Sequence, residues 1–336
     1  MTTPAAIIYL KLIINSFVLA ILFSFAAWAN YSFSLVVLLG LGMLLLSLTT
    51  LLNGIFRSLE RLDLEAKIGI IQKIWFFSAS LIGVALLEQG MLWVAAAYFS
   101  SHLIGLSLTF VLIIKYRWFN LCYSSYNIKY IYSHTWPLFI AAFLTVLSVR
   151  IEIFLLQYFH GEQAVAIYSA VIRLMDGLVI LSTAYMAAVF PRLVALVNQI
   201  SQFIGLFKHS LLILFVSSTL VVIIAYILTP WGINFLYGED YNRSIIVLQT
   251  LLPILPILFI AALLGQVLVA LERQKWFMIA LSIALGFSVV IDVFTIPYWY
   301  ELGAVIGYWS RELVLFLLLS FLVYQALHNY KKNYHV

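Results

Sequence analysis

The sequence contains a single cysteine, Cys122, among its 336 residues. One thiol cannot form an intramolecular disulfide and gives no basis for a metal cluster. The six histidines have no metal-ligand spacing, and neither a Walker loop nor a dinucleotide fingerprint is present. We therefore expect no metal, no cofactor and no catalytic residues, and no ATP-driven transport by this chain alone.

Charge is also scarce, at 9% of residues, whereas a soluble domain usually contains about 25% charged residues. The net charge is +5, but the basic residues do not cluster on a soluble face as they do in nucleic-acid-binding proteins. Hydrophobic residues make up 65% of the chain. A soluble domain of this size cannot bury so much apolar surface. The composition therefore indicates a polytopic membrane protein and excludes a nucleic-acid partner.

Ten apolar segments are long enough to cross the hydrocarbon core, which takes about 20 residues. Because lipid offers the backbone no hydrogen-bond partners, such segments form helices. The sequence therefore predicts an all-α polytopic membrane protein with about ten transmembrane helices. The predicted helices span 7–28, 33–55, 68–87, 92–114, 136–159, 166–189, 209–229, 245–270, 277–297 and 303–324.

The connections between these segments differ in positive charge when they are assigned alternately to two sides. One side carries only Arg243. The other side is predicted to be cytoplasmic, because cytoplasmic loops are enriched in Lys and Arg. Both termini then lie in the cytoplasm. The basic residues of this side are Arg57, Arg61, Lys67, Lys115, Arg117, Lys129, Arg192, Lys208, Arg273, Lys275, Lys331 and Lys332.

The longest predicted cytoplasmic connection separates four segments from six. We expect a first lobe over 1–114, a linker over 115–135, and a second lobe with a cytoplasmic tail over 136–336. The second and eighth segments end alike, since a Leu-Leu pair precedes a Leu-Glu-Arg triplet by the same interval in both. An offset of six helices predicts two lobes of the same orientation. The first lobe would then lack its first two helices.

Seven charged residues lie inside the predicted helices of the second lobe. A charge at the centre of a bilayer costs roughly 2.5–3.5 kcal/mol on the insertion scale, so such residues usually pair or face water and mark a functional path. We take them as candidate substrate-binding or coupling residues. They are Arg150, Glu152, Arg173, Asp176, Asp292, Arg311 and Glu312.

A rise of about 1.5 Å per residue places these charges at similar depth on two pairs of neighbouring helices. We expect three ion pairs between helices adjacent in sequence. The guanidinium groups suit an anionic ligand such as phosphate, and the carboxylates suit protons or cations. A purely structural role, in which the pairs lock helices together, explains the pattern nearly as well. The expected pairs are Arg150 with Asp176, Arg173 with Glu152, and Asp292 with Arg311.

Four stretches, in this order and spacing, resemble the polysaccharide flippases of the multidrug/oligosaccharidyl-lipid/polysaccharide exporter superfamily. The closest likeness is to the O-antigen and capsule repeat-unit flippases. The likeness covers essentially the whole chain, aligned to the third through twelfth helices of the family. The stretches are 148–152 (Ser-Val-Arg-Ile-Glu), 161–174 with its Ala-Ile-Tyr-Ser-Ala and Arg-Leu steps, 189–191 (Val-Phe-Pro) and 236–241 (Leu-Tyr-Gly-Glu-Asp-Tyr).

This resemblance implies two six-helix lobes around a central cavity and transport by alternating access. It implies an undecaprenyl-diphosphate-linked oligosaccharide as substrate, whose diphosphate or acidic sugars Arg150, Arg173 and Arg311 would bind. The substrate would be carried across a bacterial inner membrane to build O-antigen or another surface polysaccharide, as in lipopolysaccharide biosynthesis. Membrane lipid, polysaccharide polymerases and chain-length proteins are the partners it implies. On this alignment we expect the chain to depart from the family by lacking its first two helices.

Three other functional interpretations stay open. A cation-coupled drug antiporter on the same fold agrees with the seven charges, of which three are basic and four acidic. A non-transporting, truncated remnant agrees with the missing helices. A membrane polysaccharide polymerase or glycosyltransferase is disfavoured, because the longest outer connection, about 230–244, is too small to hold a catalytic domain. We therefore expect a transporter rather than an enzyme.

Overall fold

The computed structural model describes residues 4–28, 32–59, 61–88, 90–116 and 128–333. All regular secondary structure within these ranges is helical, which confirms the all-α fold class. The chain divides into two compact units, Met1–Ile131 and Tyr132–Val336. The finer lobe and linker limits stay a prediction. Cys122 and much of the predicted linker, 117–127, lie outside the described residues.

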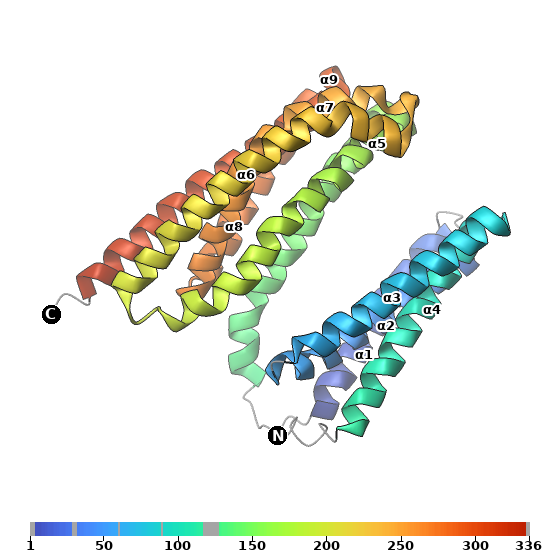
Figure 1. Ribbon diagram of the computed structural model, residues 1–336, viewed down its shortest axis with the longest axis horizontal. Coiled ribbons are helices and arrows are strands. Elements are labelled where there is room, and N and C mark those ends of the chain that lie inside the picture. The colour runs from blue at the N-terminus through green and yellow to red at the C-terminus, as the bar shows by residue number, and fades with distance from the viewer. Residues whose placement is uncertain (1–3, 29–31, 60, 89, 117–127, 334–336) are drawn as a thin grey trace. The chain divides into compact units, whose positions relative to one another are not determined.

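The first unit is a bundle in which α2 packs against α1 and α4, and α3 packs against α4 (Figure 1). A small core of Phe56, Leu64, Ile68 and Ile113 joins α2, α3 and α4. A π-helical turn, Ile82–Leu86, extends α3. The four helices are α1 (Pro4–Trp28), α2 (Phe33–Ser58), α3 (Leu62–Leu81) and α4 (Met91–Lys115).

In the second unit, α8 packs against α6 and α9, while α7 packs against the same two helices. A continuous apolar core fills the space between its helices, with Tyr168, Phe203 and Phe259 among its largest buried members. The helices are α5 (Ile128–Ala195), α6 (Ile200–Tyr237), α7 (Asn242–Leu251), α8 (Leu255–Ala270) and α9 (Gln274–Asn333), with 3-10 turns at Glu239–Tyr241 and Leu252–Ile254.

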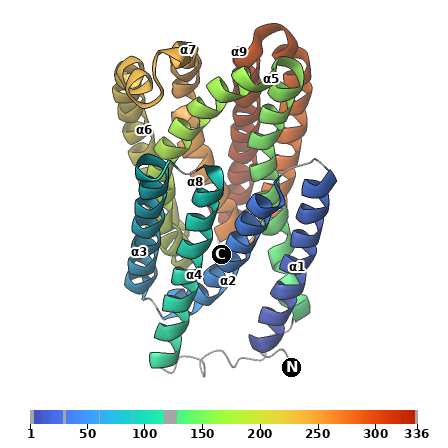
Figure 2. The same cartoon turned by 90° about the vertical axis from the view of Figure 1, so that its right-hand side faces the viewer.

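Two of these helices are hairpins, each made of two antiparallel halves joined by a tight turn (Figure 2). The turn of α5 lies at Gly161, with φ 76°, and the turn of α9 lies at Tyr300, with φ 53°. Glycine adopts positive φ without steric penalty, whereas tyrosine rarely does. The hairpin geometry brings residues on opposite sides of each turn into contact. Thr295, for example, donates its hydroxyl to the carbonyl of Gly303.

Seven helical stretches among the described residues are long and apolar enough to cross a membrane, fewer than the ten segments predicted. Two of the seven, Phe139–Ala195 and Gln274–His328, contain the turns at Gly161 and Tyr300, so each holds two predicted segments. The segment predicted at 7–28 coincides with α1, which is not one of these seven stretches. The difference in number therefore comes largely from the two hairpins.

The tip of the α9 hairpin is held by side chains from two other helices. His160 donates from Nε2 to the carbonyl of Ile296 at 2.7 Å, and its ring stacks on Tyr300 with centroids 3.8 Å apart. Arg243, at the start of α7, lies over the Tyr300 ring and donates to Glu301 at 2.7 Å. A carbonyl at a helix end lacks an intrahelical partner. These contacts satisfy that carbonyl and hold Tyr300 in its rare conformation.

We expect Arg243→Ala to destabilise the second unit by about 1–3 kcal/mol, because it leaves the carboxylate of Glu301 buried without its cation. Glu301 is only 2% exposed. The measurement is the thermal unfolding midpoint of the purified full chain in detergent. Arg192→Ala, at an exposed position near the end of α5, is the matched control and should leave the midpoint unchanged. Equal midpoints for the two variants would show that the pair contributes nothing.

Candidate functional site

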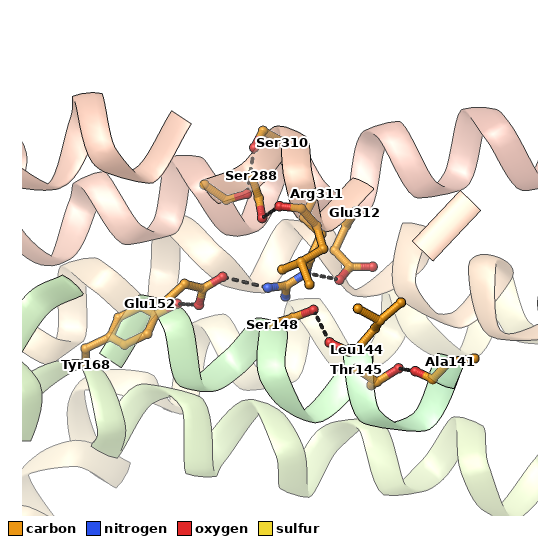
Figure 3. Close-up of polar contacts among 12 residues, drawn as sticks. Ala141, Leu144, Thr145, Ser148, Glu152, Tyr168, Ser288, Ser310, Arg311 and Glu312 are labelled. Carbon is orange, nitrogen blue, oxygen red and sulfur yellow. Dashed lines mark hydrogen bonds and ion pairs between the residues drawn. The ribbon is translucent and has the colours of Figure 1, made fainter. Parts of the chain in front are cut away.

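An ionic network lies buried in the second unit, between the two hairpins (Figure 3). Arg311 donates from Nη1 to Glu152 at 2.6 Å and from Nε to Glu312 at 3.0 Å. All three side chains are less than 10% exposed. Guanidinium suits this arrangement because its fixed fork offers donors in two directions. The network joins α5 to α9 over a sequence separation of 159 residues.

Two tyrosines complete the network. Tyr168 donates its hydroxyl to Oε2 of Glu152, the carboxylate oxygen that Arg311 does not bind. The Tyr308 ring lies against the guanidinium of Arg311, with 4.2 Å between the ring centroid and Cζ. Glu152 and Tyr168 come from opposite halves of the α5 hairpin, so the turn at Gly161 brings them together. Both oxygens of Glu152 therefore have donors, as a buried carboxylate requires.

Asp292 differs from the other buried acids because neither of its carboxylate oxygens has a hydrogen-bond partner among the described residues. Its side chain is fully buried, and it lies within electrostatic reach of Glu152 and Arg311. One guanidinium accompanies three carboxylates here, which leaves an excess of two negative charges when all four groups are ionised. Because uncompensated charge is costly inside a protein, the arrangement suits the uptake of protons or of a cation.

Two of the three predicted ion pairs are wrong. Glu152 pairs with Arg311 instead of Arg173, and Asp292 does not pair with Arg311, whose Nε and Nη1 are taken by Glu312 and Glu152. Arg173 is exposed, whereas Glu152 is fully buried, so their side chains lie in different environments. The prediction joined helices that follow one another in sequence, but the packing joins the first half of α5 to the second half of α9.

The third predicted pair, Arg150 with Asp176, is not formed as an ion pair within 4.0 Å in the described structure. The two charges interact electrostatically at longer range. Arg150, Arg173 and Asp176 are all exposed on the second unit. Arg150 and Glu152 differ in exposure because residues two apart on a helix point in different directions. The seven candidates thus separate into a buried group of four and an exposed group of three.

Sequence reasoning missed Tyr168, Tyr308 and Gly307. Tyr168 occupies the middle of a stretch noted only for its family likeness, and Tyr308 is one aromatic among many in an apolar segment. The sequence did contain a signal for Tyr308, because this residue lies three positions before Arg311 and therefore on the same helical face. Gly307 faces the carboxylate of Asp292, since a Cβ built on Gly307 would lie 1.6 Å from Oδ1. Nothing in the spacing of the chain indicated this contact.

The fold is that of multi-pass membrane transporters and flippases. A mutant of the Vibrio cholerae MATE transporter VcmN superposes with a TM-score of 0.75 at 14% identity, covering 98% of this chain and 78% of that one. A MATE protein in complex with MaL6 superposes with a TM-score of 0.80 at 15% identity, covering 97% of this chain and 78% of that one. The lipid II flippase MurJ, in an inward closed conformation, superposes with a TM-score of 0.72 at 13% identity, covering 99% of this chain and 77% of that one.

Residues 4–197, more than half of the chain, match the family described as polysaccharide biosynthesis protein. The chain belongs to this family. With the structural similarities, this confirms the resemblance to the exporter superfamily that contains the polysaccharide flippases. A comparison with curated proteins finds no match.

Proposed function

We propose that this protein translocates undecaprenyl-diphosphate-linked oligosaccharide repeat units across the bacterial inner membrane by alternating access. The translocated repeat units would be assembled into O-antigen or another surface polysaccharide. The membership of the family and the transporter-type fold support this proposal. The observation that carries it is the match of residues 4–197 to the polysaccharide biosynthesis family. The buried network around Arg311 supports transport in general, because interior charge in a membrane bundle is expensive and is usually kept for function. Both termini would lie in the cytoplasm, and polysaccharide polymerases and chain-length proteins would be partners.

The buried and exposed groups of charges would have different tasks. Arg311 already binds two carboxylates, so it has little capacity left for a phosphate. Arg150 and Arg173 are exposed and make no ion pair within 4.0 Å in the described structure. Their guanidinium groups are the better candidates for the diphosphate of the substrate, since Arg forms paired hydrogen bonds with phosphate oxygens. The carboxylate of Asp176 would modulate the affinity of this exposed group for phosphate.

The buried group would couple transport to an ion gradient. Glu152, Asp292 and Glu312 share one guanidinium, so the network gains stability when a proton or a cation neutralises part of its charge. Its residues come from both hairpins of the second unit. Uptake or release of positive charge would therefore change how strongly α5 and α9 are held together, and this would link the ion to a movement of helices.

We expect Arg150→Ala and Arg173→Ala each to reduce repeat-unit export by about tenfold, which corresponds to roughly 1.4 kcal/mol of lost interaction. Export would be measured in a bacterial strain lacking its own repeat-unit flippase, at matched protein level. The Lys variants should retain part of the activity, because they keep the charge without the paired hydrogen bonds. Arg192→Ala is the control. Normal export with both Ala variants would remove these residues from the substrate site.

A second candidate function is cation-coupled drug antiport on the same fold. The excess of buried acid favours it, as do the MATE transporters among the similar structures. Efflux of a cationic dye from cells producing this protein would distinguish the two functions. Dye efflux that depends on Glu152, together with no restoration of polysaccharide export, would favour the antiporter over the flippase.

A further inference from the structure

Gly307 lies where the carboxylate of Asp292 leaves no room for a side chain. A Cβ atom built on Gly307 would lie 1.6 Å from Oδ1, 2.4 Å from Cγ and 2.8 Å from Oδ2 of Asp292. Contacts this short do not occur between non-bonded atoms. The carboxylate in its present position and any side chain at position 307 therefore exclude each other.

Two other glycines of α9 show that this contact is specific. At Gly303, one turn before Gly307, a Cβ would meet the backbone carbonyl atoms of Thr295 at 2.6 Å. Gly303 therefore allows the two backbone segments of the hairpin to approach each other. At Gly286, a Cβ would meet nothing within 4 Å. The three glycines of α9 therefore differ. Gly303 makes room for a backbone segment, Gly307 makes room for a carboxylate, and Gly286 has open space beside it.

The contact bears on which groups Arg311 can bind. Arg311 lies one turn beyond Gly307 on the same face of α9. Asp292 is close enough to interact with Arg311 electrostatically, yet its carboxylate has no partner among the described residues, while Glu152 and Glu312 bind the guanidinium. Space beside Gly307 is thus the place where this acid can lie without entering the ion pairs.

We propose that Gly307 is a positioning residue: by lacking a Cβ it holds the Asp292 carboxylate apart from the Glu152–Arg311–Glu312 network. Asp292 then stays available to take up a proton or a cation. This inference rests on the proposed coupling role of the buried group and adds to it the residue that keeps Asp292 out of the ion pairs of Arg311 in the described structure. Because the obstruction concerns the end of a side chain, a larger residue at 307 should move the carboxylate without preventing folding.

The test is a double-mutant cycle between Gly307→Ala and Asp292→Ala in the purified full chain. When Asp292 is present, Gly307→Ala should lower the thermal midpoint. When it is combined with Asp292→Ala, the same change should raise the midpoint by about 2 °C, because alanine at 292 has no γ atom to obstruct the new methyl group and alanine at 307 favours a helix. Gly286→Ala should raise the midpoint in both backgrounds. Gly303→Ala should lower it in both, since its obstruction is backbone.

A second readout separates positioning from packing. Gly307→Ala should shift the pH profile of repeat-unit export, because the carboxylate then competes for Arg311, whereas Gly286→Ala should keep the wild-type profile. Equal effects of Gly307→Ala in the two backgrounds would overturn the contact, and an unchanged pH profile would overturn the positioning role. If the wild-type chain exports no repeat unit, the proposed function fails, and the thermal cycle still decides whether Gly307 makes room for Asp292.

Discussion

Replacing Arg311 by methionine should sharply reduce the amount of folded protein in the membrane. The change leaves Glu152 and Glu312 buried without their shared cation, at 0% and 7% exposure. Removing one partner from a buried ion pair typically costs about 3–5 kcal/mol, because the remaining charge is uncompensated. Here two carboxylates lose their partner at once, and Tyr308 loses the guanidinium against its ring. The measurement is the level of detergent-extracted, monodisperse protein, together with its thermal midpoint.

A triple variant separates stability from function. Glu152→Met, Arg311→Met and Glu312→Leu together, in a Tyr168→Phe background that removes the hydroxyl donating to Glu152, replace the network by apolar side chains of similar size, and such replacements are often neutral or stabilising. We expect the triple variant to regain the wild-type protein level and to export no repeat unit. Arg311→Met at wild-type level would show that the network is not needed for folding. A triple variant with wild-type export would show that the network is not needed for transport either.

The helices were predictable because their signal is local. A run of about 20 apolar residues must form a helix in lipid whatever it packs against. The turns at Gly161 and Tyr300 were predictable as interruptions, since they fall between the predicted segments 136–159 and 166–189, and between 277–297 and 303–324. Their geometry was not, because a tyrosine with positive φ depends on contacts from His160 and Arg243, which are distant in sequence.

The buried charges could be found from the sequence, but their partners could not. Each of the four residues stands out because charge is rare in apolar segments. Depth along a helix is also readable from the sequence, at about 1.5 Å per residue. Rotation about the helix axis and the choice of neighbouring helix come from packing. Glu152 therefore binds Arg311, 159 residues away. Asp292, for which a pair with Arg311 was predicted, lies beside Gly307 without a hydrogen-bond partner among the described residues.

Replacing Glu152 by glutamine should abolish most of the transport and leave the fold intact. Glutamine has the shape of glutamate, so its amide oxygen can accept from Arg311 while its amide nitrogen donates to the Tyr168 hydroxyl. Arg311 keeps Glu312 as its counter-charge. The variant therefore keeps both contacts, with the hydrogen bond to Tyr168 reversed in direction, and loses a negative charge. If that charge drives coupling, repeat-unit export should fall by at least about tenfold at unchanged protein level.

Glu162→Gln is the matched control, because Glu162 lies on the same helix but is exposed. It should export at the wild-type rate. Glu152→Asp adds a third comparison, since aspartate keeps the charge but is too short to bind Arg311 and Tyr168 together as Glu152 does. Partial export with Asp and almost none with Gln would assign the effect to charge. Export by the Gln variant at the wild-type rate would instead assign Glu152 a structural role, that of holding α5 to α9.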